Sequence, residues 1–271
     1  MWYVLCIKKA FIIYKENIMS VKSLLPDLIS EEPWHGGTLY KFSLAGTVAW
    51  IVEPAEPLAE KKWFWVPEWP TAFPNRNGVK ELLAMGYYMI HIHIFGMCGN
   101  PEAVGKMKEM YDFIQSLGFV RKGAFIGMSL GGLYSFRYAA TYPETVACIY
   151  ADAPVGDLGY RTRIKRADAV ELSQAYGLGD DIQAMVNHPL SPVNNFMPMV
   201  KAGIPLLLLL GLDDNILPVE EHGGLLAERW KAAGGKIEVI SRPSWGHHPH
   251  GLDDPMKILR FILVNTLNIN D

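Results

Sequence analysis

The segment of residues 124–132 constrains this chain more than any other, because a short apolar run ends there in a serine between glycines. Residues 127–131 read Gly-Met-Ser-Leu-Gly, and apolar residues at spacings of three and four follow them. A strand, a tight turn with a serine at its apex and a helix, in this order, form the pattern of a nucleophile elbow. Side chains at the flanking positions would clash in such a turn, so we expect Gly127 and Gly131 to be required there.

The two central residues of this turn are predicted to have different roles. Ser129 is raised where a base and a substrate can reach it, and it is therefore the candidate nucleophile. Leu130 opens the helix, so its backbone N–H has no partner within the helix and can stabilise an oxyanion. The alternative is an ordinary serine in a glycine-rich turn, but the strand before it and the helix after it favour catalysis.

The overall composition is that of one globular domain. The 271 residues, 50% hydrophobic and 20% charged, fit a single large α/β domain with a full core. A net charge of −3 without any basic run gives no indication of a nucleic-acid or membrane partner. Cys98 and Cys148 are interpreted as reduced thiols, and with Cys6 they form neither a metal-binding spacing nor an even disulfide set.

Residues 1–35 are predicted to be a poorly defined N-terminal extension. They begin with an apolar stretch that Lys8 and Lys9 interrupt, and that is too short for a signal peptide or a membrane span. Met19 precedes a more ordinary polar start, so we expect residues 1–18 to be a loose extension or to lie upstream of the natural start. A cytoplasmic location is the expectation that follows from these features and the reduced cysteines.

The rest of the chain, residues 36–271, alternates predicted strands with predicted helices. Besides the strand before Ser129, strands are predicted at residues 38–42, 47–52, 62–66, 87–94, 146–150, 205–210 and 236–241. Helices are predicted at residues 77–85, 219–233 and 255–267, after Asn100 and after Ser129. This alternation is typical of an α/β fold with a mostly parallel, doubly wound sheet and helices on both faces. The polar region at about 156–203 interrupts it and is predicted to form a small helical lid.

An acid and a histidine follow the last two predicted strands. Asp214 lies just beyond the strand at 205–210, and His247 lies just beyond the strand at 236–241. The carboxyl ends of parallel strands share one edge of the sheet, so both side chains are expected near Ser129. The chain order of serine, acid and histidine is that of a hydrolase triad in which the histidine takes the serine proton.

These motifs give the chain a resemblance to the α/β-hydrolases over about residues 36–268. The resemblance rests on the serine elbow, the G-x-x-D-x-x-x-P stretch at residues 211–218 and the Gly-His pair after the last strand. It implies an α/β-hydrolase fold with Ser129 as nucleophile, His247 as base and Asp214 as the orienting acid. This chemistry needs no cofactor.

A narrower resemblance concerns three short stretches: Asp-Ala-Pro-Val at 152–155, Ser-Pro at 191–192 and His-His-Pro-His at 247–250. They are similar to a bacterial group of uncharacterised hydrolases that are often found beside polysaccharide-degrading enzymes. This resemblance implies esterase activity on carbohydrate-linked esters and says little about the acyl group.

Two other aspartates compete with Asp214 for the role of the acid. Asp213 is its neighbour, and Asp152 follows the strand after the elbow, where some relatives carry the acid. The offset of Asp214 from Gly211 and Pro218 favours Asp214. Asp152 has the alternative role of capping a turn through its side chain.

The histidines after the last strand have a second interpretation as a metal site. His247, His248 and His250 lack a fourth ligand at short spacing, and Asp253 and Asp254 are better placed to cap the last helix. We therefore expect no metal, and we expect His248 and His250 to line the pocket or to hold the loop.

Two further pairs of residues are predicted to belong to the core rather than to a site. His91 and His93 share one face of a strand and are expected to be buried and hydrogen-bonded. Trp63 and Trp65 lie in a short apolar strand and are likewise expected in the core.

The loop after this strand, Pro-Glu-Trp-Pro at residues 67–70, is expected to supply the second oxyanion donor. It lacks the usual His-Gly, and its prolines have no N–H, so Glu68 or Trp69 must donate; we favour Trp69. Trp69, Trp245 and His250 are predicted to contact the substrate, with both indoles placed to stack on a sugar face.

The sequence therefore predicts a serine hydrolase that cleaves a carboxylic ester of a small or carbohydrate-linked substrate. The intact serine, acid and histidine favour an enzyme over a ligand-binding protein on a hydrolase scaffold. A C–C hydrolase or a lyase with the same three residues is the remaining alternative, because one fold hosts many chemistries. The sequence leaves open the acyl and alcohol parts of the substrate and whether the chain forms a homo-oligomer.

Overall fold

The computed structural model describes residues 19–267, which are built around a nine-stranded sheet. The strands follow the order β1-β2-β3-β5-β4-β6-β7-β8-β9. The pairs from β1 to β3 and on to β5 are antiparallel, and every pair from β5 through β4 to β9 is parallel. The strands are β1 (Leu28–Trp34), β2 (Gly37–Leu44), β3 (Thr47–Pro54), β4 (Trp63–Trp65), β5 (Tyr88–Ile92), β6 (Gly123–Met128), β7 (Val146–Asp152), β8 (Leu206–Gly211) and β9 (Ile237–Arg242).

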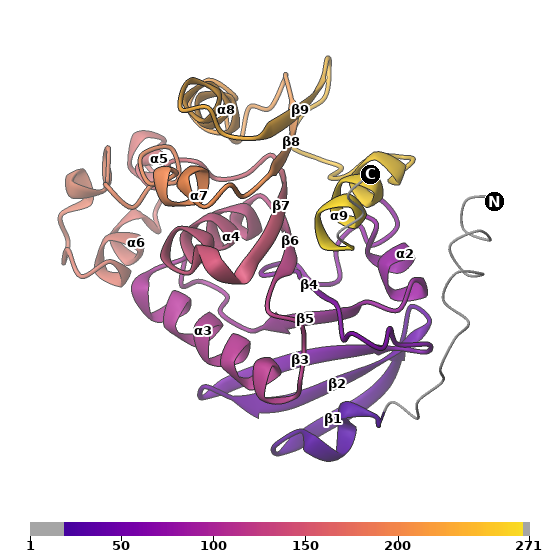
Figure 1. Cartoon of the computed structure of the whole chain (residues 1–271). Coiled ribbons are helices and arrows are strands. Elements are labelled where there is room, and N and C mark those ends of the chain that lie inside the picture. Colours follow the sequence, from indigo (N-terminus) through magenta and orange to yellow (C-terminus); the bar gives the residue numbers. More distant parts are fainter. Residues whose placement is uncertain (1–18, 268–271) are drawn as a thin grey trace.

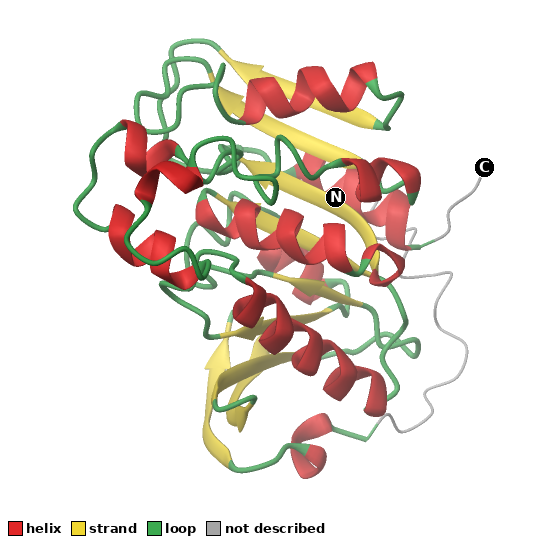
Figure 2. Cartoon of the chain, turned by 90° about the vertical axis from the view of Figure 1, so that its left-hand side faces the viewer, coloured by secondary structure: helices red, strands yellow, loops and turns green. Residues whose placement is uncertain are grey.

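Helices cover both faces of this sheet (Figures 1 and 2). The sheet separates two clusters of buried apolar residues. Buried residues of α3, α4 and α8 pack on one face, and those of α2 and α9 pack on the other. The helices are α2 (Val79–Ala84), α3 (Pro101–Ser116), α4 (Leu130–Thr141), α5 (Tyr160–Arg163), α6 (Ala169–Ala175), α7 (Met197–Lys201), α8 (Gly223–Ala232) and α9 (Met256–Thr266), with short 3-10 turns η1 (Val21–Leu24), η2 (Pro143–Thr145) and η3 (Ile182–Met185). The predicted α/β fold, with a mostly parallel, doubly wound sheet, is confirmed.

Local sequence signals explain several of these elements. Asn100 caps α3, because its side chain accepts a hydrogen bond of 2.8 Å from the Ala103 N–H. Ala45 and Gly46 both have positive φ and join β2 to β3 in the predicted hairpin. α8 begins at Gly223 rather than at residue 219, because the preceding residues form a separate hydrogen-bonded turn.

The folded domain begins before the boundary predicted at residue 36. β1 pairs antiparallel with β2, and the Ser20 hydroxyl donates a hydrogen bond of 2.6 Å to the Glu53 carboxylate on β3. β1 is an edge strand whose side chains are exposed or half-buried, so it lacks the apolar alternation that marks a strand in the sequence. The predicted loose segment of residues 1–18 lies outside the described residues.

Three of the four residues predicted for the core are buried, and the fourth is exposed. Trp63 and Trp65 are buried in β4, as expected. His91 is buried, and its Nδ1–H donates to the Val66 carbonyl over 2.8 Å, while burial lowers its pKa to about 4. His93 is exposed, contrary to prediction, although its backbone N–H still donates to the Val48 carbonyl of β3 over 2.8 Å.

The region at 156–203, predicted to form a small helical lid, contains the short helices α5, α6 and α7 and the 3-10 turn η3. Its start is held by His222, whose Nδ1 accepts hydrogen bonds from the N–H groups of Gly156 and Asp157 at 3.1 and 3.3 Å. Burial lowers the pKa of His222 to about 4, so the imidazole is neutral near pH 7 and free to accept. The Asp157 carboxylate in turn accepts from the Ser191 hydroxyl at 2.9 Å.

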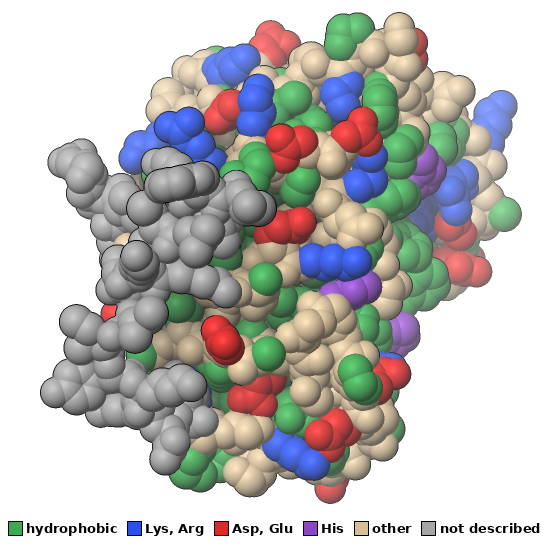
Figure 3. All heavy atoms as spheres, turned by 90° about the vertical axis from the view of Figure 1, so that its right-hand side faces the viewer, with side chains coloured by type: hydrophobic (Ala, Val, Ile, Leu, Met, Phe, Trp, Pro, Cys, Tyr) green, Lys and Arg blue, Asp and Glu red, His purple; other side chains and the backbone are tan. Residues whose placement is uncertain are grey.

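The surface is mixed in charge. On the face drawn in Figure 3, positive and negative side chains are interspersed with hydrophobic ones, and no large patch of one sign forms. Within residues 19–267, no helix combines the length and the apolar character needed to cross a membrane.

Candidate active site

The serine turn lies between β6 and α4 as the sequence predicted. Ser129 has φ 50° and ψ −116°, and its backbone N–H donates to the Asp152 carbonyl over 2.9 Å. A Cβ at Gly127 would lie 2.7 Å from the Cα of Gly132, so this position requires glycine. A Cβ at Gly131 would lie 3.4 Å from its nearest neighbour, which is an ordinary contact. The second sterically required glycine is therefore Gly132, where a Cβ would overlap Pro154.

Ser129, His247 and Asp214 form a continuous hydrogen-bonded chain. Nε2 of His247 lies 3.0 Å from the Ser129 hydroxyl oxygen, and Nδ1 of the same ring lies 2.7 Å from Oδ2 of Asp214. Ser129 lies in the elbow after β6, Asp214 in the loop after β8 and His247 in the loop after β9. These segments meet at the carboxyl edge of the sheet. In the tautomer that fits these partners, Nδ1 carries the proton and Nε2 accepts from the serine.

The Asp214 carboxylate is buried and fully engaged. Its Oδ1 accepts hydrogen bonds of 2.9 Å from the N–H groups of Ile216 and Leu217, and Oδ2 faces His247. Burial acts to raise the pKa of Asp214, but the hydrogen bonds from His247 and the two backbone groups outweigh it and lower the pKa. Asp214 is therefore ionised near pH 7 and can support a positive charge on the imidazole.

Asp213 and Asp152, the two alternatives to Asp214 as the orienting acid, do not contact Nδ1 of His247. Asp213 is exposed, and its backbone N–H donates to the Trp245 carbonyl over 3.0 Å. Asp152 is fully buried, where its Oδ1 lies 3.2 Å from Nη2 of Arg242 and its Oδ2 accepts from the Gly251 N–H. The structure thus brings Asp214, and not these two carboxylates, to Nδ1 of His247.

The loop at residues 245–251 is held by two arginines that the sequence analysis did not single out. Nη1 of Arg242 donates to the carbonyls of Pro249 and Gly251 over 3.3 and 2.9 Å. Nε of Arg76 donates to the His250 carbonyl over 2.7 Å. The position of Arg242 directly at the end of the last strand was the available signal, whereas Arg76 comes from a distant loop and carried none.

A cavity of about 310 Å³ opens beside Ser129. It is lined by Trp69, Ala72, Phe73, Met128, Ser129, His247, His248 and His250. Trp69 and His250 therefore line the pocket as predicted, but Trp245 does not. The Trp245 ring lies instead under the Arg242 guanidinium, 4.8 Å from the ring centre, and its Nε1–H donates to the Pro249 carbonyl.

The predicted lid contributes no side chain to this cavity. Two loops close it instead, namely the residues after β4 and the residues after β9. The ring of Phe73, which the sequence analysis also missed, stacks against His248 at 6.2 Å and meets His250 edge-on at 5.6 Å.

The two predicted oxyanion donors, Leu130 and Trp69, come from the serine turn and from the loop after β4. Leu130 is the first residue of α4, so its N–H has no acceptor within the helix. Trp69 lines the same cavity as Ser129, with a half-exposed side chain and φ 57°. The neighbouring Glu68 packs its backbone against Gly131 at the start of α4, and burial raises the pKa of its carboxyl to about 7.

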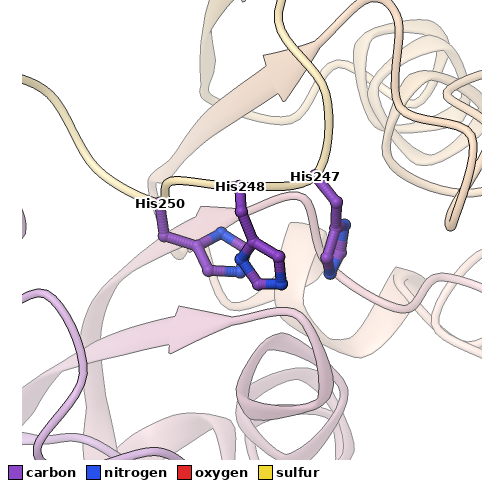
Figure 4. Close-up of side chains that lie close together, drawn as sticks. All are labelled: His247, His248 and His250. Carbon is purple, nitrogen blue, oxygen red and sulfur yellow. The ribbon is translucent and has the colours of Figure 1, made fainter.

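His247, His248 and His250 project from one loop and lie close together (Figure 4). One ligand nitrogen from each ring can be chosen so that all three lie within 4.8 Å of one another. In the part of the chain that the structure describes, this is the only group of three or more potential metal ligands with such spacing.

Comparisons with known proteins identify the fold. No protein-family model and no curated protein matches the chain. A truncated carbohydrate esterase from gut microbiota matches with a TM-score of 0.60 and 20% identity, over 81% of this chain and 90% of that one. A bacterial membrane phospholipase A matches with a TM-score of 0.56 and 15% identity, over 86% and 88% of the two chains.

Longer proteins match as well. The acylaminoacyl peptidase of Pyrococcus horikoshii has a TM-score of 0.59 and 15% identity over 90% of this chain, but only 43% of its own length is covered. The chain spans between 36% and 43% of the peptidases that it matches. Together these likenesses show that the chain has the α/β-hydrolase fold.

Proposed function

We propose that this α/β-hydrolase-fold chain is a serine hydrolase that cleaves carboxylic esters of small or carbohydrate-linked substrates. The observation that carries the proposal is the hydrogen-bonded chain from Ser129 through His247 to Asp214. A serine hydroxyl is a poor nucleophile until a base takes its proton, and the imidazole is oriented for that transfer.

The proposed reaction has two halves. Ser129 attacks the ester carbonyl as its proton passes to Nε2 of His247, and the protonated imidazole then gives that proton to the leaving alcohol. Water, activated by the same histidine, hydrolyses the acyl-serine and releases the acid. Asp214 stabilises the imidazolium throughout, and the backbone N–H groups of Leu130 and Trp69 are the proposed oxyanion donors.

One observation supports an ester over a peptide, and a second supports a sugar alcohol. The membrane phospholipase A is covered over 88% of its chain, whereas the matched peptidases are more than twice as long as the part covered. The indole of Trp69 at the cavity mouth is partly exposed, and such a ring can stack on the apolar face of a sugar.

Covalent labelling tests the proposed nucleophile directly. A fluorophosphonate probe is expected to label the wild-type chain and not the Ser129→Ala variant, with both proteins showing the same melting temperature. A panel of acetylated sugars, methyl-esterified sugars, aryl esters and aminoacyl anilides then separates esterase from peptidase activity. Absence of labelling in the folded wild-type protein would favour a ligand-binding protein and would overturn the proposal.

A further inference from the structure

The three histidines of the active-site loop have an arrangement that the proposed ester hydrolysis does not require. Only His247 transfers a proton in that reaction, yet the ligand nitrogens of His247, His248 and His250 lie within 4.8 Å of one another. A zinc ion binds histidine nitrogens at about 2.0–2.1 Å, so side-chain shifts of about 1 Å bring the three to one ion. Figure 4 shows all three rings directed to the same side of the loop.

Two of these rings are backed by carboxylates. Nδ1 of His247 lies 2.7 Å from Asp214 Oδ2, and Nδ1 of His250 lies 3.5 Å from Asp152 Oδ1. Both aspartates are buried, and Nδ1 of His250 has no closer hydrogen-bond partner. In protein metal sites the ligating histidine commonly gives its other ring N–H to a carboxylate, which fixes the ring and raises its basicity. The Nε2 atoms of His247 and His250 are then the ones available to a metal.

The loop that carries the rings is already fixed. Arg242 and Arg76 donate hydrogen bonds to its carbonyls at Pro249, His250 and Gly251. A ligand that binds such a loop does not have to order it first, so little of its binding free energy is lost.

From this geometry we propose that His247, His248 and His250 form a binding site for a transition-metal dication of the zinc type, and that the bound ion reversibly blocks the serine. Imidazole nitrogens without thiolate or carboxylate ligands suit zinc, copper and nickel better than magnesium or calcium. The ion takes the lone pair of His247 Nε2, which lies 3.0 Å from the Ser129 hydroxyl oxygen and has to accept its proton. Three protein ligands leave a coordination position for water or an anion.

The binding is tested with Zn²⁺ alone, by isothermal titration calorimetry on the full chain near neutral pH. One ion is expected to bind per chain. His248→Ala and His250→Ala are each expected to weaken binding on the order of tenfold or more. His93→Ala is the matched control, because His93 is exposed and lies outside the cluster, and its affinity should equal that of the wild type. His248 is also exposed, so His248→Ala is the variant whose fold is least at risk.

A second measurement tests the block. Zn²⁺ is expected to inhibit hydrolysis of an aryl ester, EDTA to restore it, and His248→Ala to need more Zn²⁺ for the same fractional inhibition. This arm depends on the proposed ester hydrolysis, whereas the calorimetry does not, so the failure of one proposal is distinguishable from the failure of the other. No binding of Zn²⁺, an affinity equal to that of the wild type in both histidine variants, or full activity of the zinc-bound protein would each overturn the inference.

Discussion

Arg242 and Asp152 form a buried ion pair, with 3.2 Å between Nη2 of the arginine and Oδ1 of the aspartate. The pair joins the end of β9 to the end of β7, and both partners also bind the backbone of Gly251. Because the Ser129 N–H bonds the Asp152 carbonyl, one aspartate contacts both the serine turn and the histidine loop. This pair therefore links the serine turn to the histidine loop of the candidate active site.

Removing the arginine from this pair is expected to destabilise the protein strongly. Arg242→Met leaves the buried Asp152 without its partner, a change that typically costs about 3–5 kcal/mol of unfolding free energy. Chemical denaturation followed by circular dichroism measures this loss. Arg260→Met is the control, because Arg260 is exposed on α9. Similar losses in the two variants would contradict a structural role for the Arg242 ion pair.

Asp214→Asn is expected to lower kcat by about 10³- to 10⁴-fold with a modest change in KM. The amide cannot support the imidazolium, and it leaves His247 free to adopt the wrong tautomer. Steady-state kinetics on the best ester substrate measure both constants. The neighbouring Asp213→Asn is the control and should be much milder, because Asp213 is exposed. A kcat near that of the wild type in Asp214→Asn would show that Asp214 is not the acid. A large loss of kcat in Asp152→Asn would then assign that role to Asp152.

The meeting of Ser129, Asp214 and His247 could be predicted from the sequence for a topological reason. Each residue follows a predicted parallel strand, and the carboxyl ends of such strands share one edge of the sheet whatever their side chains do. The fold class followed from the same alternation of strands and helices.

Details that depend on packing between distant segments could not be predicted. The Trp245 indole lies against the Arg242 guanidinium and donates to the Pro249 carbonyl, and it does not line the cavity. The edge strand β1 has mostly exposed side chains and therefore no apolar alternation to reveal it. His93 lies just beyond the end of β5 at Ile92, and the boundaries of elements are the part of a sequence prediction that local patterns define least.

Substitution by alanine is expected to affect stability differently at two glycines of the serine turn, Gly127 and Gly131. Gly127→Ala is expected to cost about 1–3 kcal/mol of stability, because its Cβ would lie 2.7 Å from Gly132 and 2.8 Å from the Gly131 carbonyl oxygen. Gly131→Ala should be neutral or slightly stabilising, since it lies in α4 with room for a methyl group. Thermal melts of both variants provide the comparison. Equal destabilisation by the two substitutions would contradict the packing described for this turn.

Burial of the Glu68 carboxyl is expected to make the free energy of unfolding fall as the pH rises. Its carboxyl has a pKa of about 7 in the folded protein against 4.5 for an ordinary glutamate, because it is buried. Between these two pH values the folded state keeps a proton that the unfolded chain has lost, so unfolding becomes progressively easier as the pH increases.

The test compares Glu68→Gln with the wild type across that pH range. The variant has no proton to lose, so its melting temperature relative to that of the wild type should rise as the pH increases from about 4.5 to about 7. Glu228→Gln, which changes an exposed glutamate on α8, is the control and should show no such trend. A constant difference between Glu68→Gln and the wild type would rule out this linkage.

The backbone of Ser129, at φ 50° and ψ −116°, has a further consequence for the evolution of this chain. Residues with a Cβ pay on the order of 1–3 kcal/mol to adopt such a conformation, and glycine does not. Selection for thermal stability alone would therefore favour glycine at position 129 and would remove the hydroxyl. The serine at position 129 therefore lowers stability relative to glycine, and the proposed role of its hydroxyl as the nucleophile accounts for its presence there.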